Sequence, residues 1–208
     1  PAPDHFSRCT VVNTQGPALV DTLPSPRPMS PGEFEQAARH EKAIVLDSRP
    51  YESFGAQHVP GAYSIDMEAN FPILAGSVIP PEKDILLVAL SYEQAGEAVE
   101  WLRRVGLDRT VGFLDGGMPA WALAGLATSH VPQLSAVEFH DKLTTDKDIA
   151  VLDVRAEAEF KNAHIERAIN IPVSDLRTRY TELDPSKPLI VVCPGGNRAT
   201  MGISLLMQ

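Results

Sequence analysis

The chain has 208 residues and a formal net charge of −9, with 18 Lys and Arg against 27 Asp and Glu. This acidic balance argues against nucleic acid as the main partner, because binding phosphates requires a basic surface, and no apolar run approaches the roughly 20 residues of a membrane-spanning helix. Two cysteines, Cys9 and Cys193, are too few for a disulfide framework, so we expect a cytoplasmic protein that binds neither nucleic acid nor membrane.

Residues 1–29 are expected to form an extended N-terminal segment that connects to an upstream module. The stretch from Thr22 to Pro31 is rich in proline, which favours extended backbone. Cys9 belongs to this segment, outside the repeated part of the chain, and we interpret it as a structural residue.

An internal repeat follows this segment. Residues 44–65 and 150–171 share residues at one constant offset of 106 positions, among them Asp47/Asp153, Arg49/Arg155, Phe54/Phe160, His58/His164, Ala62/Ala168 and Ile65/Ile171. Such agreement indicates a duplicated domain of ordinary size. We therefore expect domains at 30–128 and 135–208, joined by a linker at 129–134.

Each repeat has the same predicted order of elements. Ser30 with Glu33, and Ser135 with Glu138, are typical of capping boxes that start short helices. The other predicted elements are short apolar strands at 43–46, 85–89, 149–152 and 189–193, an amphipathic helix at 94–105, and a strand, glycine turn and helix start at 111–121. Strands that alternate with helices predict an α/β fold, a mainly parallel central sheet flanked by helices in each domain.

The second domain is expected to be incomplete at its C-terminal end. Aligning the strands at 85–89 and 189–193 gives an offset of 104, which places the counterpart of Trp121 at position 225, beyond Gln208.

The most informative stretch surrounds Cys193. A buried strand delivers this cysteine into a Gly195-Gly196 turn, after which a helix begins. Inward-pointing N–H groups in such a turn, together with the positive end of the helix, stabilise a thiolate. A thiolate is the species that attacks another sulfur atom, and Arg198 places a cation close to the loop.

The other recurring polar residues are interpreted as structural. His58 and His164 precede apolar turns, so a structural hydrogen bond is predicted for each. Buried Asp–Arg pairs are predicted for Asp47 with Arg49 and for Asp153 with Arg155.

Taken together, these motifs resemble the rhodanese family of sulfurtransferases, arranged as a tandem of two domains. The matching pieces are the Leu-Asp-x-Arg strand ends, the His-x-Pro-Gly-Ala-type turn, the Cys-x4-Arg loop and the run Leu114-Asp115-Gly116-Gly117-Met118-x-x-Trp121. The resemblance implies that Cys193 carries a sulfane sulfur as a persulfide, that Pro194, Gly195, Gly196 and Asn197 supply loop amides to the substrate, and that Arg198 assists the donor. It implies no metal and no cofactor.

The first repeat departs from this pattern. Ala89 stands at the nucleophile position and Gln94 at the arginine position, and residues 90–93 replace the glycine loop. We therefore expect the first domain to be catalytically silent and to shape the mouth of the second.

A second resemblance concerns the N-terminal segment. Residues 13–17 and the proline-rich stretch are similar to the end of the metallo-β-lactamase-fold module in fusion proteins that carry rhodanese domains and act on persulfides in sulfide oxidation. This implies an upstream domain of that kind in the same polypeptide. The His-x-His-x-Asp metal motif of that module is absent from the printed sequence.

Two other functions remain open from the sequence. A cysteine phosphatase also holds a thiolate and an arginine around an anion, but with five intervening residues rather than four. A non-catalytic interaction module is the other alternative. The expected substrates are thiosulfate or a low-molecular-weight persulfide as donor and a thiol or cyanide-like acceptor; the oligomeric state is left open.

Overall fold

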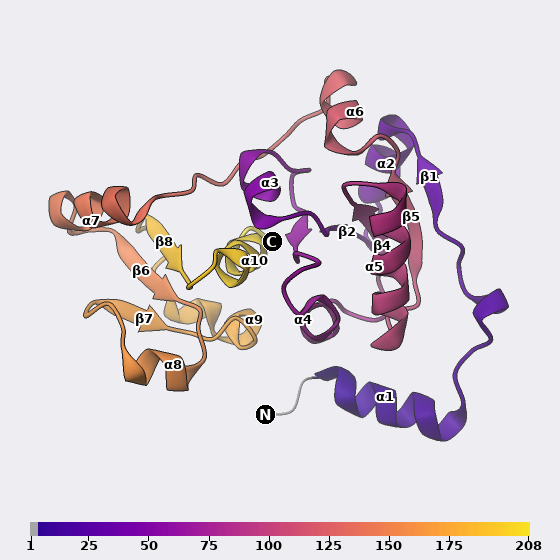
Figure 1. Cartoon of the computed structure of the whole chain (residues 1–208), viewed down its shortest axis with the longest axis horizontal. Helices are drawn as coiled ribbons and strands as arrows, with labels where there is room; N and C mark the ends of the chain where they lie inside the picture. Colours follow the sequence, from indigo (N-terminus) through magenta and orange to yellow (C-terminus); the bar gives the residue numbers. More distant parts are fainter. Residues whose placement is uncertain (1–3) are drawn as a thin grey trace.

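The computed structural model describes residues 4–208, which form two α/β domains (Figure 1). The elements of the first half are α1 (Asp4–Gln15), η1 (Val20–Thr22), β1 (Arg27–Met29), α2 (Pro31–Ala38), β2 (Ala43–Asp47), α3 (Tyr51–Ala56), β3 (Tyr63–Ser64), α4 (Phe71–Val78), β4 (Asp84–Val88), α5 (Tyr92–Arg104), β5 (Thr110–Leu114) and α6 (Gly117–Leu123). Both predicted capping boxes are present, at Ser30 here and at Ser135 in the second half.

The first domain is built on a five-stranded sheet with the order β1-β5-β4-β2-β3. Every strand pair in it is parallel. The central strand β4 reads Asp-Ile-Leu-Leu-Val and is buried from Ile85 onwards, as expected for a strand covered on both faces. The predicted parallel sheet is thus confirmed in this half of the chain.

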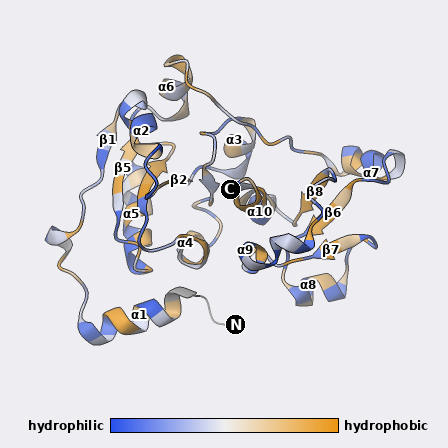
Figure 2. Ribbon diagram, turned by 180° about the vertical axis from the view of Figure 1, so that it is seen from behind, coloured by the Kyte–Doolittle hydropathy of each residue, from blue (hydrophilic) through white to orange (hydrophobic). Residues whose placement is uncertain are grey.

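The second domain repeats the middle of this plan. Its elements are α7 (Ala136–Thr145), β6 (Ala150–Asp153), α8 (Glu157–Asn162), β7 (Ala168–Asn170), α9 (Leu176–Arg179), η2 (Tyr180–Glu182), β8 (Leu189–Val192) and α10 (Asn197–Leu206). Within the described residues its sheet has three parallel strands in the order β7-β6-β8, the counterparts of β3-β2-β4. Figure 2 shows the hydrophobic colouring concentrated along strands such as β5, β6 and β8.

The N-terminal segment is more structured than the expected extended connector. Residues 4–15 form the helix α1, and the Arg8 guanidinium donates two hydrogen bonds to the Val105 carbonyl oxygen, at 3.2 and 2.7 Å. Residues 27–29 form the edge strand β1 beside β5. Proline is compatible with such an edge, because an edge strand leaves some N–H groups unpaired in any case. The sheet of the first half therefore includes residues 27–29.

The two domains share one continuous hydrophobic core. A single cluster of buried side chains includes Leu46, Ile65 and Phe71 from the first half and Leu152, Ile171 and Met201 from the second. Helix α10 lies between the second sheet and the first domain (Figure 1). There the Ser64 N–H donates a 3.0 Å hydrogen bond to Oγ of Ser204, which is fully buried.

The linker lies along the first domain. His58 and Ser129 exchange a pair of backbone hydrogen bonds, both 2.9 Å, and the Val131 N–H donates to the Gly55 carbonyl oxygen at 2.8 Å. The Gln133 side chain packs directly over Gly55, so a Cβ at this position would force that side chain to move. None of the helices in the described part of the chain has both the length and the apolar character needed to cross a membrane.

Candidate active site

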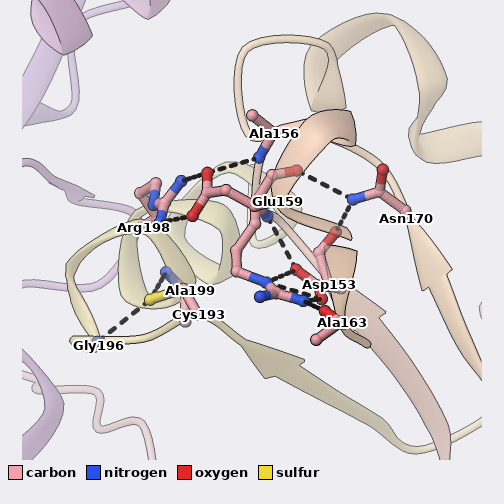
Figure 3. Close-up of polar contacts among 10 residues, drawn as sticks. Asp153, Ala156, Glu159, Ala163, Asn170, Cys193, Gly196, Arg198 and Ala199 are labelled. Atoms are coloured by element: carbon pink, nitrogen blue, oxygen red, sulfur yellow. Dashed lines mark hydrogen bonds and ion pairs between the residues drawn. The ribbon is translucent and has the colours of Figure 1, made fainter. Parts of the chain in front are cut away.

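Cys193 immediately follows β8 and precedes the turn that leads into α10. Its Sγ accepts hydrogen bonds from the backbone N–H groups of Gly196, at 3.1 Å, and Ala199, at 3.3 Å (Figure 3). Both donors lie at the N-terminal end of α10, where the helix dipole also favours negative charge. The sulfur is half-buried and faces these two donors at the start of the helix.

Four loop residues were expected to supply amides: Pro194, Gly195, Gly196 and Asn197. Of these, Gly196 is the one whose N–H bonds the Cys193 sulfur. Pro194 has no backbone N–H and cannot donate, and Pro194 and Gly195 are exposed. Gly196 has φ of +86°, in the region that favours glycine, and this conformation turns its N–H toward the sulfur. The buried Asn197 Oδ1 has no hydrogen-bond partner among the described residues, so it is available as an acceptor beside the loop.

Arg198 is oriented by a carboxylate on another helix. Its Nη1 and Nη2 donate to the two carboxylate oxygens of Glu159 in α8, at 2.7 and 2.9 Å. This two-bond geometry holds the planar guanidinium firmly. Hydrogen bonding from Arg198 lowers the pKa of Glu159 to about 2. Arg198 is therefore not a free cation above the loop, because Glu159 balances its charge.

A second arginine, Arg155, lies close enough to Glu159 to help lower the pKa of that carboxylate. The Arg155 guanidinium bonds the buried Asp153 carboxylate at 2.6 and 2.9 Å and the Ala163 carbonyl oxygen at 2.7 Å. The same arrangement recurs in the first domain, where Arg49 bonds Asp47. The predicted Asp–Arg pairs are confirmed, and they fix the strand ends from which the site is built.

The two recurring histidines have structural positions. Nδ1 of His58 lies 2.8 Å from the Phe54 carbonyl oxygen, and Nδ1 of His164 lies 2.8 Å from that of Phe160. Each ring stacks on the ring of the same phenylalanine. The predicted structural hydrogen bond is confirmed in both repeats.

The corresponding loop of the first domain contains no such cradle. Ala89 follows β4, and α5 begins at Tyr92, which leaves a turn one residue shorter than the turn between β8 and α10. The Gln94 side chain accepts a 2.7 Å hydrogen bond from the Leu90 N–H, and Ser91 caps the helix through the Gln94 N–H. The backbone donors of this turn are thus engaged by its own side chains.

The loop that follows Cys193 faces the first domain and the linker. A cavity of about 840 Å³ opens beside Cys193, and its lining includes Tyr51, Gln133, Val192 and Gly196. Tyr51 comes from α3 of the first domain, so both halves of the chain contribute to this space.

Comparison with known protein families decides the assignment. The sequence profile of the rhodanese-like domain matches residues 30–124 and again 135–208. The chain belongs to the rhodanese-like domain family. The match covers both halves of the internal repeat, so this is a tandem of two rhodanese-like domains.

Several named proteins are similar to this rhodanese tandem. The putative sulfur carrier protein YrkF of Bacillus subtilis is 32% identical over 73 residues, which are 35% of this chain and 40% of that protein. The putative sulfurtransferase YtwF of the same organism is 25% identical over 33% of this chain and 67% of its own length. An uncharacterized Synechocystis protein, slr1261, is 29% identical over 48% of this chain and 54% of its own. This chain thus spans only about half, or less, of YrkF and slr1261.

Among solved structures, SseA of Escherichia coli, titled a 3-mercaptopyruvate sulfotransferase, aligns over 88% of this chain and 94% of its own, with a TM-score of 0.44 and 16% identity. A thiosulfate sulfurtransferase of Pseudomonas aeruginosa aligns over 98% of this chain and 43% of its own, with a TM-score of 0.43 and 18% identity.

Sequence reasoning missed three contributors to the rhodanese site. These are the Ala199 N–H, the Glu159 carboxylate and the Tyr51 ring. Glu159 lies six residues after Asp153 in the short helix α8, and its pairing with Arg198 depends on how that helix packs beside the loop. Tyr51 lies 142 positions before Cys193, and its approach depends on how the two domains pack.

Proposed function

We propose that this chain is a sulfurtransferase that carries a sulfane sulfur on Cys193. In the first half-reaction the Cys193 thiolate attacks the outer sulfur of a donor R–S–SH. The S–S bond of the donor breaks, RS⁻ leaves with the bonding electron pair, and Cys193 becomes the persulfide Cys–S–SH.

The second half-reaction returns the enzyme to its starting state. An acceptor thiolate R′S⁻ attacks the outer sulfur of the persulfide, forming R′S–SH and releasing the Cys193 thiolate. With cyanide as acceptor the product is thiocyanate. Neither half-reaction changes the total number of electrons, so no external oxidant or reductant is needed.

The pair of N–H groups that point at Cys193 Sγ is the observation that carries this proposal. The same two amides serve the reaction twice, because the leaving group of the second half-reaction is the Cys193 thiolate itself. Preorganised donors aimed at a developing negative charge are among the largest contributions to catalysis. Membership of the rhodanese-like family is consistent with this chemistry.

The charges around the loop favour a low-molecular-weight persulfide over thiosulfate as donor. Arg198 is matched by Glu159, and Arg155 is matched by Asp153. A thiosulfate dianion would have to approach the Glu159 carboxylate and compete with it for Arg198. A persulfide bears its reacting sulfur on a group with less charge and meets less repulsion. This chemistry requires no upstream metallo-β-lactamase-fold module.

The decisive test compares the wild type with Cys193→Ser. We expect the wild type to form thiocyanate from glutathione persulfide and cyanide, and more slowly from thiosulfate, while the variant forms none with either donor. Mass spectrometry should find one added sulfur atom on the Cys193 peptide after donor treatment without acceptor. Equal thiocyanate rates in the two proteins would refute the assignment. Hydrolysis of a phosphate ester that depends on Cys193 would favour a phosphatase instead.

A further inference from the structure

The silent first domain places an aromatic ring against the catalytic loop. A Cβ built on Gly196 would lie 2.6 Å from Cζ and 2.7 Å from Cδ2 of Tyr51. The ring therefore packs directly on the Gly196 backbone, with no room for a side chain between them. Gly196 is the residue whose N–H bonds the Cys193 sulfur.

Tyr51 is itself held in place by its backbone. Its N–H donates to Asp66 Oδ2 at 3.3 Å, and its carbonyl oxygen accepts from Gln133 Nε2 of the linker at 3.2 Å. The first bond joins the start of α3 to the Asp66 side chain, and the second joins it to the linker. The ring thus extends from a fixed point rather than from a mobile loop.

The far end of the catalytic helix is fixed by the same domain. Ser204 Oγ in α10 accepts from the Ser64 N–H and donates to the Met201 carbonyl oxygen, at 3.0 and 2.7 Å. The first domain therefore contacts α10 at both ends, at the Gly196 cap and at Ser204.

We propose that Tyr51 of the first domain is a positioning residue for sulfur transfer, because its ring holds Gly196 in the conformation that directs the N–H at Cys193. The inference rests on the proposed function. The proposed role would also explain how the first domain, which has Ala89 at the cysteine position, contributes to the reaction. The Thr200 N–H donates to the Gly196 carbonyl oxygen at 2.9 Å, but before Gly196 the turn is open, since Pro194 and Gly195 are exposed and the two glycines permit many backbone conformations.

The aromatic ring acts by packing rather than by its hydroxyl. The Glu52 carboxylate, partial burial and the nearby Cys193 sulfur raise the pKa of Tyr51, so the side chain is neutral at pH 7. A phenylalanine would make the same contact with Gly196. An alanine would remove this packing contact, so the Gly196 N–H would point at the sulfur for a smaller part of the time.

Kinetics of three variants test this role. We expect Tyr51→Ala to lower kcat for persulfide-to-cyanide transfer about tenfold with little change in KM, a fraction of the loss that follows complete removal of one such donor. Tyr51→Phe should retain the wild-type kcat. Tyr92→Ala is the matched control, because Tyr92 is an exposed tyrosine of the same domain.

Hydrogen exchange provides a readout that does not depend on turnover. In Tyr51→Ala, the amides of residues 195–199 should exchange faster, while those of the buried strand β6 keep the wild-type rate and report an intact fold. Tyr51→Phe should match the wild type in both segments.

Several results would overturn the inference. A wild-type kcat and unchanged loop exchange in Tyr51→Ala would show that the ring does not position Gly196. A rise in KM alone would make Tyr51 a substrate contact, and a Tyr51→Phe variant as slow as Tyr51→Ala would assign the effect to the hydroxyl. Failure of the proposed function itself would be seen separately, as an inactive wild type whose loop exchange still responds to Tyr51.

Discussion

Under the proposed function, Glu159 and Arg198 set the charge that a donor meets at Cys193. Their side chains remain 40% and 31% exposed, so a bound molecule reaches both groups. Because the pKa of Glu159 is about 2, this carboxylate is ionised throughout the neutral range. The arginine that the sequence suggested as an aid to an anionic donor is therefore largely neutralised by a residue on α8.

Removing the Glu159 charge should change donor preference. We expect Glu159→Gln to lower the KM for thiosulfate by about three- to tenfold, since an ionic hydrogen bond of about 1 kcal/mol or more is then available from Arg198. The KM for glutathione persulfide should change less. The measurement is thiocyanate formation over a range of each donor concentration.

Glu157→Gln is the control for this prediction. Glu157 lies on the same helix and pairs with Lys161 in an exposed salt bridge, away from the loop. The same KM change in both variants would mean that overall charge, rather than Arg198, governs donor binding. An unchanged KM for thiosulfate in Glu159→Gln would remove the argument for a persulfide donor.

Two loops at equivalent places in the two sheets differ in what they do with their backbone N–H groups. After β8, the turn directs two N–H groups at a sulfur atom. After β4, the turn is shorter and its Leu90 and Gln94 N–H groups bond local side chains. The two domains therefore differ in the backbone of this loop as well as in the residue at the cysteine position.

A cysteine introduced at the silent position should stay inactive. We expect Ala89→Cys in a Cys193→Ser background to form no thiocyanate above that background, because no amide cradle surrounds residue 89. Ala89 is buried and small, so the substitution fits the site. Adding Ala89→Cys to the otherwise wild-type chain controls for folding, and its rate should match the wild type. Restored transfer in the double variant would contradict this explanation.

The elements were largely predictable because their signals are local. Capping boxes at Ser30 and Ser135 and apolar runs that end at Asp47 and Asp153 define helices and strands within a few residues. The position of Cys193 between a strand and a helix followed from the same signals. The ion pair of Arg198, by contrast, depends on the approach of α8, which no periodicity reveals. The helix at 4–15 was not predicted, because the prolines at 22–31 favour extended backbone for the N-terminal segment.

The two domains are joined through a shared core rather than by the linker alone. Side chains of both halves lie in one hydrophobic cluster, and Ser204 of α10 is buried against β3. Domains with a common core unfold together, because neither can lose its structure without exposing apolar surface of the other.

This coupling predicts a single unfolding transition. Calorimetry of the wild type should show one cooperative transition, and Ser204→Ala should lower the free energy of unfolding by about 1–3 kcal/mol, since it leaves the buried Ser64 N–H without an acceptor. Ser174→Ala is the control, because Ser174 is exposed and bonds only its neighbour Asp175. Two resolved transitions in the wild type, or equal effects of the two substitutions, would show that the halves unfold independently.

The linker has a consequence for the order of events during turnover. Its backbone is bonded to the first domain at Ser129 and Val131, and Gln133 reaches the start of α3. A carrier domain on a flexible linker could accept sulfur from a donor at one site and transfer it to an acceptor at another. Here Cys193 cannot travel, so under the proposed chemistry donor and acceptor must take turns at one entrance. The first product has to depart before the second substrate arrives.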